Sequence, residues 1–199
     1  MNKVKVLIEG YAKVYDDYED VSPSVVLIEN EKHKMIIDPG FNREKLLKAL
    51  EKEGLKTGDI TAVLLTHNHM DHFPLVGMFE KAIVLDDSDQ YSQDGIIRRQ
   101  SEGMLGEGIE LISTPGHDPF HCSVAVETKD MGKVVISGDI FWWVDEEEPE
   151  KDFESLVNLE DPYVKDEKAL KESREKILKI ADWIIPGHGK IFRNLSKNK

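Results

Sequence analysis

The residues best suited to chemistry lie in one short segment, Thr66–His72. Its sequence, Thr-His-Asn-His-Met-Asp-His, places three imidazoles and one carboxylate in six consecutive positions. Both are ligands of catalytic zinc, which keeps one coordination position open for water. His67 and His69 can converge on one metal ion, while Asp71 and His72, further round the turn, can reach a second. The alternative explanation is a polar surface loop that is rich in histidine by chance.

Side chains of the same kind recur later in the chain, each after an apolar segment. His117 follows a Pro-Gly turn, His188 lies between two glycines, and Asp139 follows Ser137-Gly138. Five of the seven histidines therefore lie in Thr66–His72 or in these two turns, which argues against chance. A carboxylate presented after a buried strand, as we predict for Asp139, is costly unless a cation receives it.

Apolar, β-branched runs predict the strands that would position these side chains. The run Ile60–Leu65 predicts a buried strand that ends at the histidine segment. Asp38 ends another predicted strand, where it can cap a tight turn or accept an N–H from a ligand imidazole. The remaining strands are predicted at residues 4–8, 24–29, 34–37, 82–85, 109–112, 122–126, 133–136 and 183–185.

Helices are predicted where apolar residues recur on one face. One spans residues 42–53, with Leu46, Leu47 and Leu50 on a common face. Another spans 166–180, with a stripe of Leu170, Ile177, Leu178 and Ala181, and a short one at 73–79 is expected beneath the histidine segment. Residues 86–108 and 141–165 show no clear periodicity. We expect 86–108 to be irregular and near the mouth of the site, 141–165 to be irregular, and His33 to be exposed in a polar turn.

The order of these elements indicates the fold class. The strands fall into two halves separated by helices and are too rich in hairpins for a doubly wound sheet. Two sheets packed face to face with helices outside accommodate this pattern. A chain of 199 residues is long enough for a sizeable core, and we expect residues 1–199 to form one domain.

The composition argues against nucleic-acid and membrane partners. The net charge of −13 repels phosphate backbones, so that no nucleic-acid partner is expected. No apolar run is long enough to span a bilayer, and Met1-Asn2-Lys3 leads directly into a predicted strand. We therefore expect neither a membrane partner nor a signal peptide. The single cysteine, Cys122, excludes an intrachain disulfide and indicates a reducing, cytoplasmic location.

The combination of these motifs resembles the metallo-β-lactamase superfamily. The similarity rests on Thr-His-x-His-x-Asp-His, Thr-Pro-Gly-His, Ser-Gly-Asp and Pro-Gly-His-Gly in this order, preceded by Asp38-Pro39-Gly40. It covers residues 4 to about 190 and implies an α+β fold, a four-layer αββα sandwich with a binuclear metal centre at one edge. Carried over by position, it implies a first metal ion held by His67, His69 and His117, a second held by Asp71, His72 and His188, and Asp139 bridging both.

Asp139 narrows the expected activity within that superfamily. True β-lactamases of this fold usually carry cysteine or serine there, whereas an Asp is similar to the glyoxalase II, lactonase and nuclease branches. We expect a metal-dependent hydrolase that uses a metal-bound hydroxide to cleave a small ester, thioester, lactone or related substrate. The two divalent ions would be Zn²⁺, with Mn²⁺ or Fe²⁺ as alternatives. Asp71 would position the hydroxide and pass a proton to the leaving group.

Three other functions remain open from the sequence. A mononuclear iron dioxygenase of persulfides shares the first three histidines and the Asp, but loses part of the second ligand set. A phosphodiesterase or nuclease of the same superfamily is the next alternative, and a metal-binding protein without catalysis is the last. The joint presence of Asp71, His72 and His188 favours two metal ions and hydrolysis.

Several reactive or aromatic residues are assigned structural roles. We expect His121 to form a hydrogen bond near the site without binding metal, and Cys122 to be a small buried hydrophobe. Phe141-Trp142-Trp143 follows Asp139 and could line the substrate pocket or form a homodimer contact; the sequence offers no way to choose. The acidic run 145–150 is expected to be a solvated loop.

Overall fold

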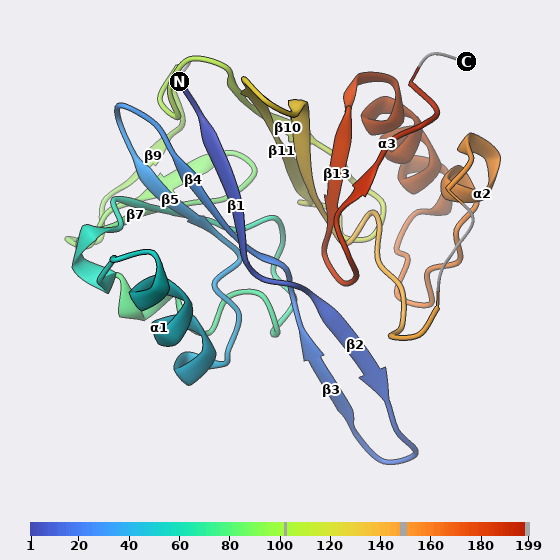
Figure 1. Cartoon of the computed structure of the whole chain (residues 1–199), viewed down its shortest axis with the longest axis horizontal. Helices are drawn as coiled ribbons and strands as arrows, with labels where there is room; N and C mark the ends of the chain where they lie inside the picture. The colour runs from blue at the N-terminus through green and yellow to red at the C-terminus, as the bar shows by residue number, and fades with distance from the viewer. Residues whose placement is uncertain (102, 148–150, 198–199) are drawn as a thin grey trace.

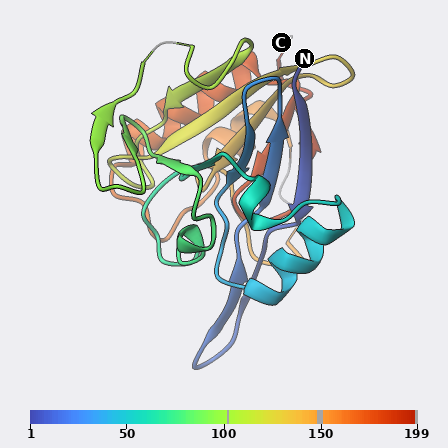
Figure 2. The same cartoon turned by 90° about the vertical axis from the view of Figure 1, so that its left-hand side faces the viewer.

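Two β-sheets pack face to face, and helices cover their outer faces (Figure 1). The structure, a computed structural model, describes residues 1–101, 103–147 and 151–197. Helix α1 (Arg43–Lys52) lies outside the first sheet, and helices α2 (Phe153–Val157) and α3 (Glu167–Ile180) lie outside the second (Figures 1 and 2). This arrangement is the αββα sandwich that the sequence predicted.

The first sheet places the histidine segment at the end of a central strand. Its strand order is β1-β4-β5-β6-β7-β8-β9, and β5, β6 and β7 run parallel. Carboxyl ends of parallel strands share one edge of the sheet, so that Asp38 after β5 and Thr66 after β6 become neighbours. The bounds are β1 Lys3–Ile8, β4 Val25–Glu29, β5 Lys34–Ile37, β6 Ala62–Leu64, β7 Ile83–Leu85, β8 Asp89–Tyr91 and β9 Ile97–Arg99.

The second sheet brings the later motifs to the same edge. Its order is β10-β11-β12-β13-β14, and β12 and β13 run parallel, so that Asp139 and His188 both follow neighbouring strands. The bounds are β10 Ile109–Ser113, β11 Cys122–Thr128, β12 Gly132–Gly138, β13 Trp183–Pro186 and β14 Phe192–Arg193.

Three apolar clusters hold the four layers together. The middle cluster lies between the sheets, where Val26 and Ile37 of the first meet Val124 and Ile136 of the second. Residues one position along the same strands face outwards instead, as Leu27 does towards the cluster under α1. Both faces of each central strand are therefore buried, which explains why these strands appear in the sequence as continuous apolar runs.

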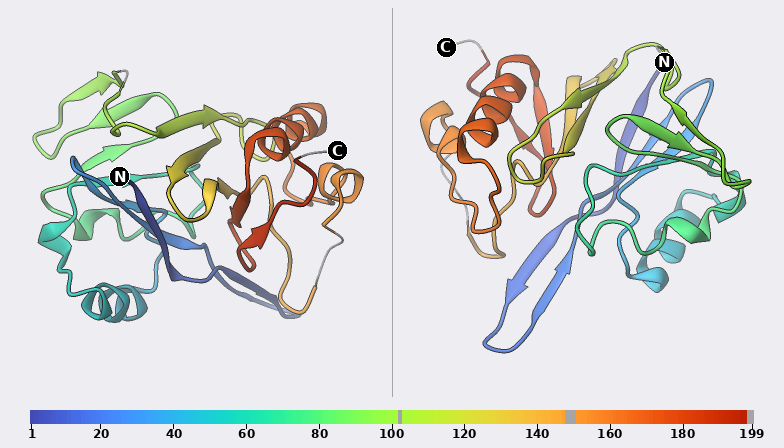
Figure 3. Two further views of the ribbon diagram at one scale, coloured as in Figure 1. Left: turned by 45° about the horizontal axis from the view of Figure 1, so that its top comes forward. Right: turned by 180° about the vertical axis from the view of Figure 1, so that it is seen from behind.

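A two-stranded hairpin projects from the sandwich between β1 and β4 (Figures 1 and 3). It consists of β2 (Tyr11–Val14) and β3 (Glu19–Ser22), which pair only with each other among the described strands. Its sequence is polar and acidic, and it was not predicted. At its base, Gly10 and Gly189 form an isolated bridge, which attaches the hairpin to the turn that carries His188.

Several predicted segments have a different structure. The segment 86–108, expected to be irregular, contains two short strands, β8 and β9, which extend the first sheet beyond β7. None of its described residues lines the pocket that contains His69 and His188. The segment 73–79 forms only a 3₁₀ turn at Val76–Met78, and 141–165 includes α2. His33 is half-buried, since its ring bonds Thr61 and the carbonyl of Met104.

The two longer helices agree with the prediction. Helix α1 buries Leu46, Ala49 and Leu50 and leaves Leu47 half-exposed, and Asn42 caps its first turn. Helix α3 begins after its capping residue Asp166 and packs its predicted stripe on the second sheet. None of the helices in the described ranges is both long and apolar enough to cross a bilayer. Of the acidic run 145–150, residues 148–150 lie outside the described residues.

Helix α3 also buries a cation, Arg174, which is only 1% exposed. Its guanidinium donates to the backbone carbonyls of Ile140, Val157 and Leu159, and so ties α3 to the segment after β12 and to α2. Burial lowers the pKa of Arg174 to about 10, which leaves the side chain charged at neutral pH.

We expect Arg174→Met to destabilise the fold by about 3 kcal/mol, because three buried carbonyls lose their donor while the apolar stem is kept. Urea unfolding followed by circular dichroism measures this change. Lys168→Met on the exposed face of the same helix is the control and should change the free energy of unfolding by less than about 0.5 kcal/mol. Equal stability of the two variants would contradict a structural role for Arg174.

Candidate metal centre

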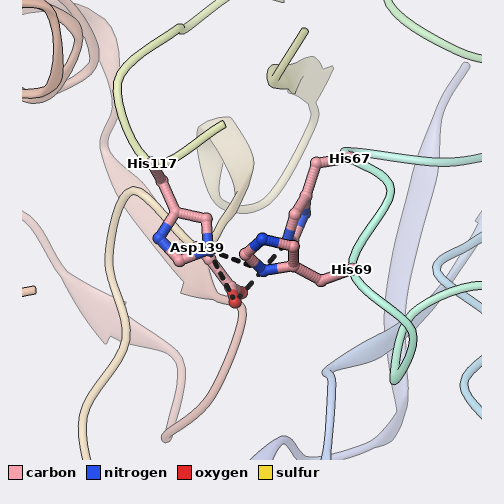
Figure 4. A group of neighbouring side chains, drawn as sticks. All are labelled: His67, His69, His117 and Asp139. Atoms are coloured by element: carbon pink, nitrogen blue, oxygen red, sulfur yellow. Dashed lines mark hydrogen bonds and ion pairs between the residues drawn. The ribbon is translucent and has the colours of Figure 1, made fainter. Parts of the chain in front are cut away.

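The seven residues singled out by the sequence come together at one edge of the sandwich. His67, His69, His117 and Asp139 form one group of possible ligand atoms, and Asp71, His72 and His188 form a second (Figure 4 shows the first). Within each group the ligand atoms lie within 4.8 Å of one another. They come from the loops after β6, β10, β12 and β13, and hence from both sheets.

Asp139 lies at the centre of both groups. Its carboxylate oxygens lie 3.7 Å from His67 Nε2, 3.5 Å from His117 Nε2, 3.4 Å from His72 Nε2 and 3.6 Å from His188 Nε2. These distances are too long for good hydrogen bonds. Ligand atoms that share a tetrahedral zinc ion at 2.0–2.1 Å lie about 3.3–3.4 Å apart, so the observed spacing fits ligands better than direct partners.

The orientation of His67 and His72 is fixed by Asp38. His72 Nδ1 donates to Asp38 Oδ2 at 3.0 Å, which is one of the two roles considered for Asp38 from the sequence. Thr66 donates its hydroxyl proton to the same carboxylate at 2.7 Å, so its oxygen can only accept from His67 Nδ1 at 3.0 Å. Both Nδ1 atoms therefore carry their protons, and the Nε2 atoms face the site with free lone pairs in the neutral rings.

His117 and His188 are held in the same way by other acceptors. His117 Nδ1 donates to Asp161 Oδ2 at 2.7 Å, and His188 Nδ1 donates to the carbonyl of Tyr11 at 3.0 Å. Asp161 was not predicted from the sequence, since it lies in the acidic stretch without periodicity. Its only local signal is the Asp-Pro pair at 161–162, which marks a turn and says nothing of an imidazole.

Several site atoms have no partner in the described part of the protein. They are His67 Nε2, His72 Nε2 and Asp139 Oδ1, all of them buried. Buried polar atoms are normally hydrogen-bonded, so three such atoms around one point require an explanation. Imidazole nitrogens and a carboxylate are the donor set that zinc accepts, and a cation between them would satisfy all three.

The electrostatics of the site follow from this crowding. Burial favours the neutral forms, yet the Asp139 and Asp38 carboxylates raise the pKa of His72 well above its usual value. Burial also opposes a charge on His188, but Asp139 and Asp71 raise its pKa to about 10. In turn, His72 and His188 hold the pKa of Asp139 well below its usual value despite its burial. The site is therefore built to hold an anion, Asp139, against positive charge.

His121 is oriented differently from the other histidines. Its Nε2 accepts the backbone N–H of Asp139 at 3.1 Å, and its Nδ1 donates to Thr114 Oγ1 at 2.9 Å. Burial and the neighbouring His117 lower the pKa of His121 to about 3, which keeps the ring neutral. Both nitrogens are thus occupied, and His121 holds the backbone that carries Asp139, in agreement with the predicted hydrogen-bonding role.

Two glycines allow the close approach of the site loops. A Cβ atom at Gly187 would overlap the carboxylate of Asp139, and one at Gly138, whose φ is +53°, would overlap Thr66 and His121. Close packing at the centre therefore requires glycine at these two positions, Gly138 of Ser-Gly-Asp and Gly187 of Pro-Gly-His-Gly.

The aromatic segment after Asp139 divides between the core and a pocket. Phe141 and Trp143 are buried beneath α2 and α3, whereas Trp142 lines a pocket with His69, Asp71 and His188. Trp142 is thus a pocket wall, one of the two roles considered for the segment. Cys122 is fully buried between the sheets, as expected of a small hydrophobe.

Comparison with known proteins agrees with the fold and the motifs. The sequence model of the metallo-beta-lactamase superfamily matches residues 18–87. Metallo-beta-lactamase domain-containing protein 1 of Xenopus laevis is 34% identical over 200 residues, which cover 96% of this chain and 82% of that protein. The chain belongs to the metallo-beta-lactamase superfamily. It spans 62% and 60% of the proteins of the same name in rat and human.

Solved structures support the same fold. A Thermotoga maritima protein that is assigned to the metallo-beta-lactamases superimposes with a TM-score of 0.72 at 22% identity, over 96% of this chain and 99% of that one. AidC, a dizinc quorum-quenching lactonase, superimposes with a TM-score of 0.61 at 17% identity, over 86% of this chain and 73% of that one. At this level of identity the likeness establishes the fold alone.

We expect Asp161→Asn to weaken binding of the metal ion next to His117 by about 10–100-fold, because an amide no longer fixes and polarises the imidazole as a carboxylate does. Titration of the protein against a zinc-chelating dye measures the change. Glu160→Gln removes the same charge from the adjacent exposed residue and should leave the affinity unaltered. Equal affinities of both variants would show that Asp161 has no such role.

His117→Ala and His121→Ala should differ in metal content. If each of the two groups holds one ion, loss of His117 removes a ligand atom of the first group and should leave about one metal ion per chain. Loss of His121 removes only the support of the Asp139 backbone, so both ions should remain, with activity reduced about 10–100-fold. Metal analysis of the two purified variants decides this; the reverse pattern would overturn the ligand assignment.

Proposed function

We propose that this protein is a hydrolase of a small ester, thioester, lactone or related carbonyl compound, with two divalent metal ions held by the seven residues. Zinc is the first choice, and manganese or iron the alternatives. His67, His69 and His117 would hold one ion, Asp71, His72 and His188 the other, and Asp139 would bridge them. We further propose that residues 1–199 form one domain around this centre.

One observation carries the proposal: four imidazoles have Nδ1 engaged as a donor and Nε2 turned towards Asp139. Their acceptors are Thr66, Asp38, Asp161 and the carbonyl of Tyr11. A group of histidines that served only structure would use both ring nitrogens on protein partners, as His121 does, whereas Nε2 of His67 and Nε2 of His72 have no partner among the described residues. Nε2 of His117 lies 3.0 Å from Nδ1 of His69, which belongs to the same group of possible ligand atoms. Here four separate acceptors prepare the same nitrogen of four rings for a ligand bond.

Metal ions bound at such a site would supply an activated water and positive charge that stabilises the developing oxyanion. The chain's own residues supply the rest. Asp71 is half-buried at the floor of the pocket, with Oδ2 3.3 Å from His188 Nε2 and 3.5 Å from His72 Nε2. Although burial opposes it, the hydrogen bond with His188 and the charge of His72 lower the pKa of Asp71, so it is a carboxylate at neutral pH.

As a carboxylate that faces the pocket, Asp71 can accept the proton of the attacking water. It can then return this proton to the leaving oxygen or sulfur, which completes hydrolysis to an acid and an alcohol or thiol. His121 and Gly187 keep the Asp139 carboxylate in place during this exchange, because they fix its backbone and the space beside it.

The test of this function combines metal content with activity. Protein prepared without chelator should contain about two metal ions per chain by inductively coupled plasma mass spectrometry. It should hydrolyse members of a panel of esters, thioesters and lactones in preference to phosphodiesters. A consistent ratio near one iron with oxygen consumption would instead support a dioxygenase, and no turnover on any panel member would reject the proposal.

Asp139→Asn should release metal and lower kcat/KM by at least about 100-fold, because the amide keeps the shape but removes the charge shared by both ligand groups. The melting temperature of the metal-free variant, followed by circular dichroism, should show that the fold survives. Asp130→Asn in the exposed turn between β11 and β12 is the matched control. Wild-type metal content and turnover in Asp139→Asn would mean that Asp139 is structural.

A further inference from the structure

The pocket above the candidate centre has one wall made by the β2–β3 hairpin. Side chains alternate along its strands, and Ala12, Val14, Glu19 and Val21 all face the pocket. The register agrees, since Ala12 pairs with Val21 and Val14 with Glu19. Residues of the opposite face, such as Asp20, line a separate hollow. The hairpin therefore presents three apolar side chains and one carboxylate to a substrate.

Glu19 is distinct among the groups that line this pocket. The other acidic residues there, Asp71 and Asp139, belong to the candidate ligand set, whereas Glu19 is exposed at the outer end of the hairpin wall. No lysine or arginine is among the described residues that line the pocket. Glu19 Oε1 accepts a hydrogen bond from Tyr163 Oη at 3.1 Å, and the other carboxylate oxygen has no hydrogen-bond partner among the described residues.

Two aromatic rings, Trp142 and Tyr163, line the pocket beside the hairpin. Tyr163 packs against Trp142, with ring centroids 5.7 Å apart and planes inclined by 35°. The indole N–H of Trp142 donates to Asp161 at 3.3 Å, so its polar edge is already occupied. Burial and the neighbouring Glu19 raise the pKa of Tyr163, which keeps the phenol neutral. The rings therefore offer π faces and no positive charge.

Aromatic faces beside a carboxylate are the arrangement that binds organic cations. An ammonium gains from the ring quadrupoles and from the Glu19 charge, whereas an anionic group in the same place is repelled by that charge. The net charge of −13 adds a long-range attraction for cations. The end of the pocket at the candidate metal centre favours negative charge instead, because metal ions there would attract the partly negative carbonyl oxygen of a substrate.

We propose that the substrate carries a protonated or quaternary amine on its apolar portion, bound between Glu19, Trp142 and Tyr163 while the reactive carbonyl lies at the metal centre. This inference rests on the proposed hydrolase function for its orientation of the substrate. It makes Glu19 a specificity-determining residue and predicts poor turnover of substrates whose distal group is anionic.

The kinetic test compares two esters with the same acyl group. One is the 2-(trimethylammonio)ethyl ester, and the other is its uncharged 3,3-dimethylbutyl isostere, in which carbon replaces nitrogen. We expect the metal-loaded protein to favour the cationic ester by about tenfold in kcat/KM. Glu19→Gln should remove most of this preference, because kcat/KM for the cationic ester should fall by about tenfold.

Asp20→Asn is the matched control, because it removes the same charge from the opposite face of the same hairpin. It should retain the preference, which separates local recognition at Glu19 from the effect of net charge. An equal loss in both variants, or a preference for the neutral ester in the wild type, would overturn the proposal.

A binding test keeps the inference separate from hydrolysis. Tetramethylammonium chloride is titrated into the 199-residue chain against lithium chloride of equal ionic strength, with tryptophan fluorescence and calorimetry as readouts. Saturable binding that Glu19→Gln weakens about tenfold and Asp20→Asn does not would support the cation site even if no ester were turned over. Hydrolysis without tetramethylammonium binding would reject the cation site and leave the hydrolase function standing.

Discussion

The structure depends on placing one carboxylate, Asp139, inside the protein. It is 4% exposed and lies 3.4–3.7 Å from four imidazole nitrogens. A buried anion is tolerated only where positive charge surrounds it, and unpartnered it would cost several kcal/mol. The strand order meets this constraint. Parallel pairing of β5 with β6 and of β12 with β13 brings carboxyl ends from both sheets to one edge, so that residues far apart in sequence surround Asp139.

A second ring of acceptors sets the direction of each imidazole. Asp38 serves two of them, directly for His72 and through Thr66 for His67, and it also accepts the Thr66 backbone N–H at 2.9 Å. Asp161 serves His117, and through Trp142 the same carboxylate contacts the pocket wall. Positioning of the candidate ligands and shaping of the pocket therefore share side chains. A substitution at Asp161 should consequently disturb both the orientation of His117 and the position of the pocket wall. A substitution at Asp38 should disturb the imidazoles but not the pocket wall.

The sequence predicted those parts of the molecule whose pattern is local. Continuous apolar runs indicated the central strands. Polar residues at the ends of these runs indicated the site, because the end of a strand holds a side chain in place regardless of the remaining topology. Asp38 was found by the same signal. The β2–β3 hairpin was not, since its two strands are polar and gain their order from a bridge at Gly189 and a hydrogen bond from His188 to Tyr11. Asp161 was missed for a similar reason: its partner is 44 residues away, and nothing nearby in the chain indicates it.

The position of the β2–β3 hairpin has a consequence for how such proteins diverge. None of its residues, all of which the structure describes, belongs to the three apolar clusters that hold the sandwich together. Its length and side chains can therefore change at little cost in stability, as long as the bridge at Gly10 and the position of the Tyr11 carbonyl, which accepts from His188, are kept. A lineage could replace Glu19 or lengthen the hairpin without altering any ligand of the centre. Descendants of one ancestor would then catalyse the same reaction and differ in the substrates that they bind. The sequence differences between them would lie mainly in residues 11–22.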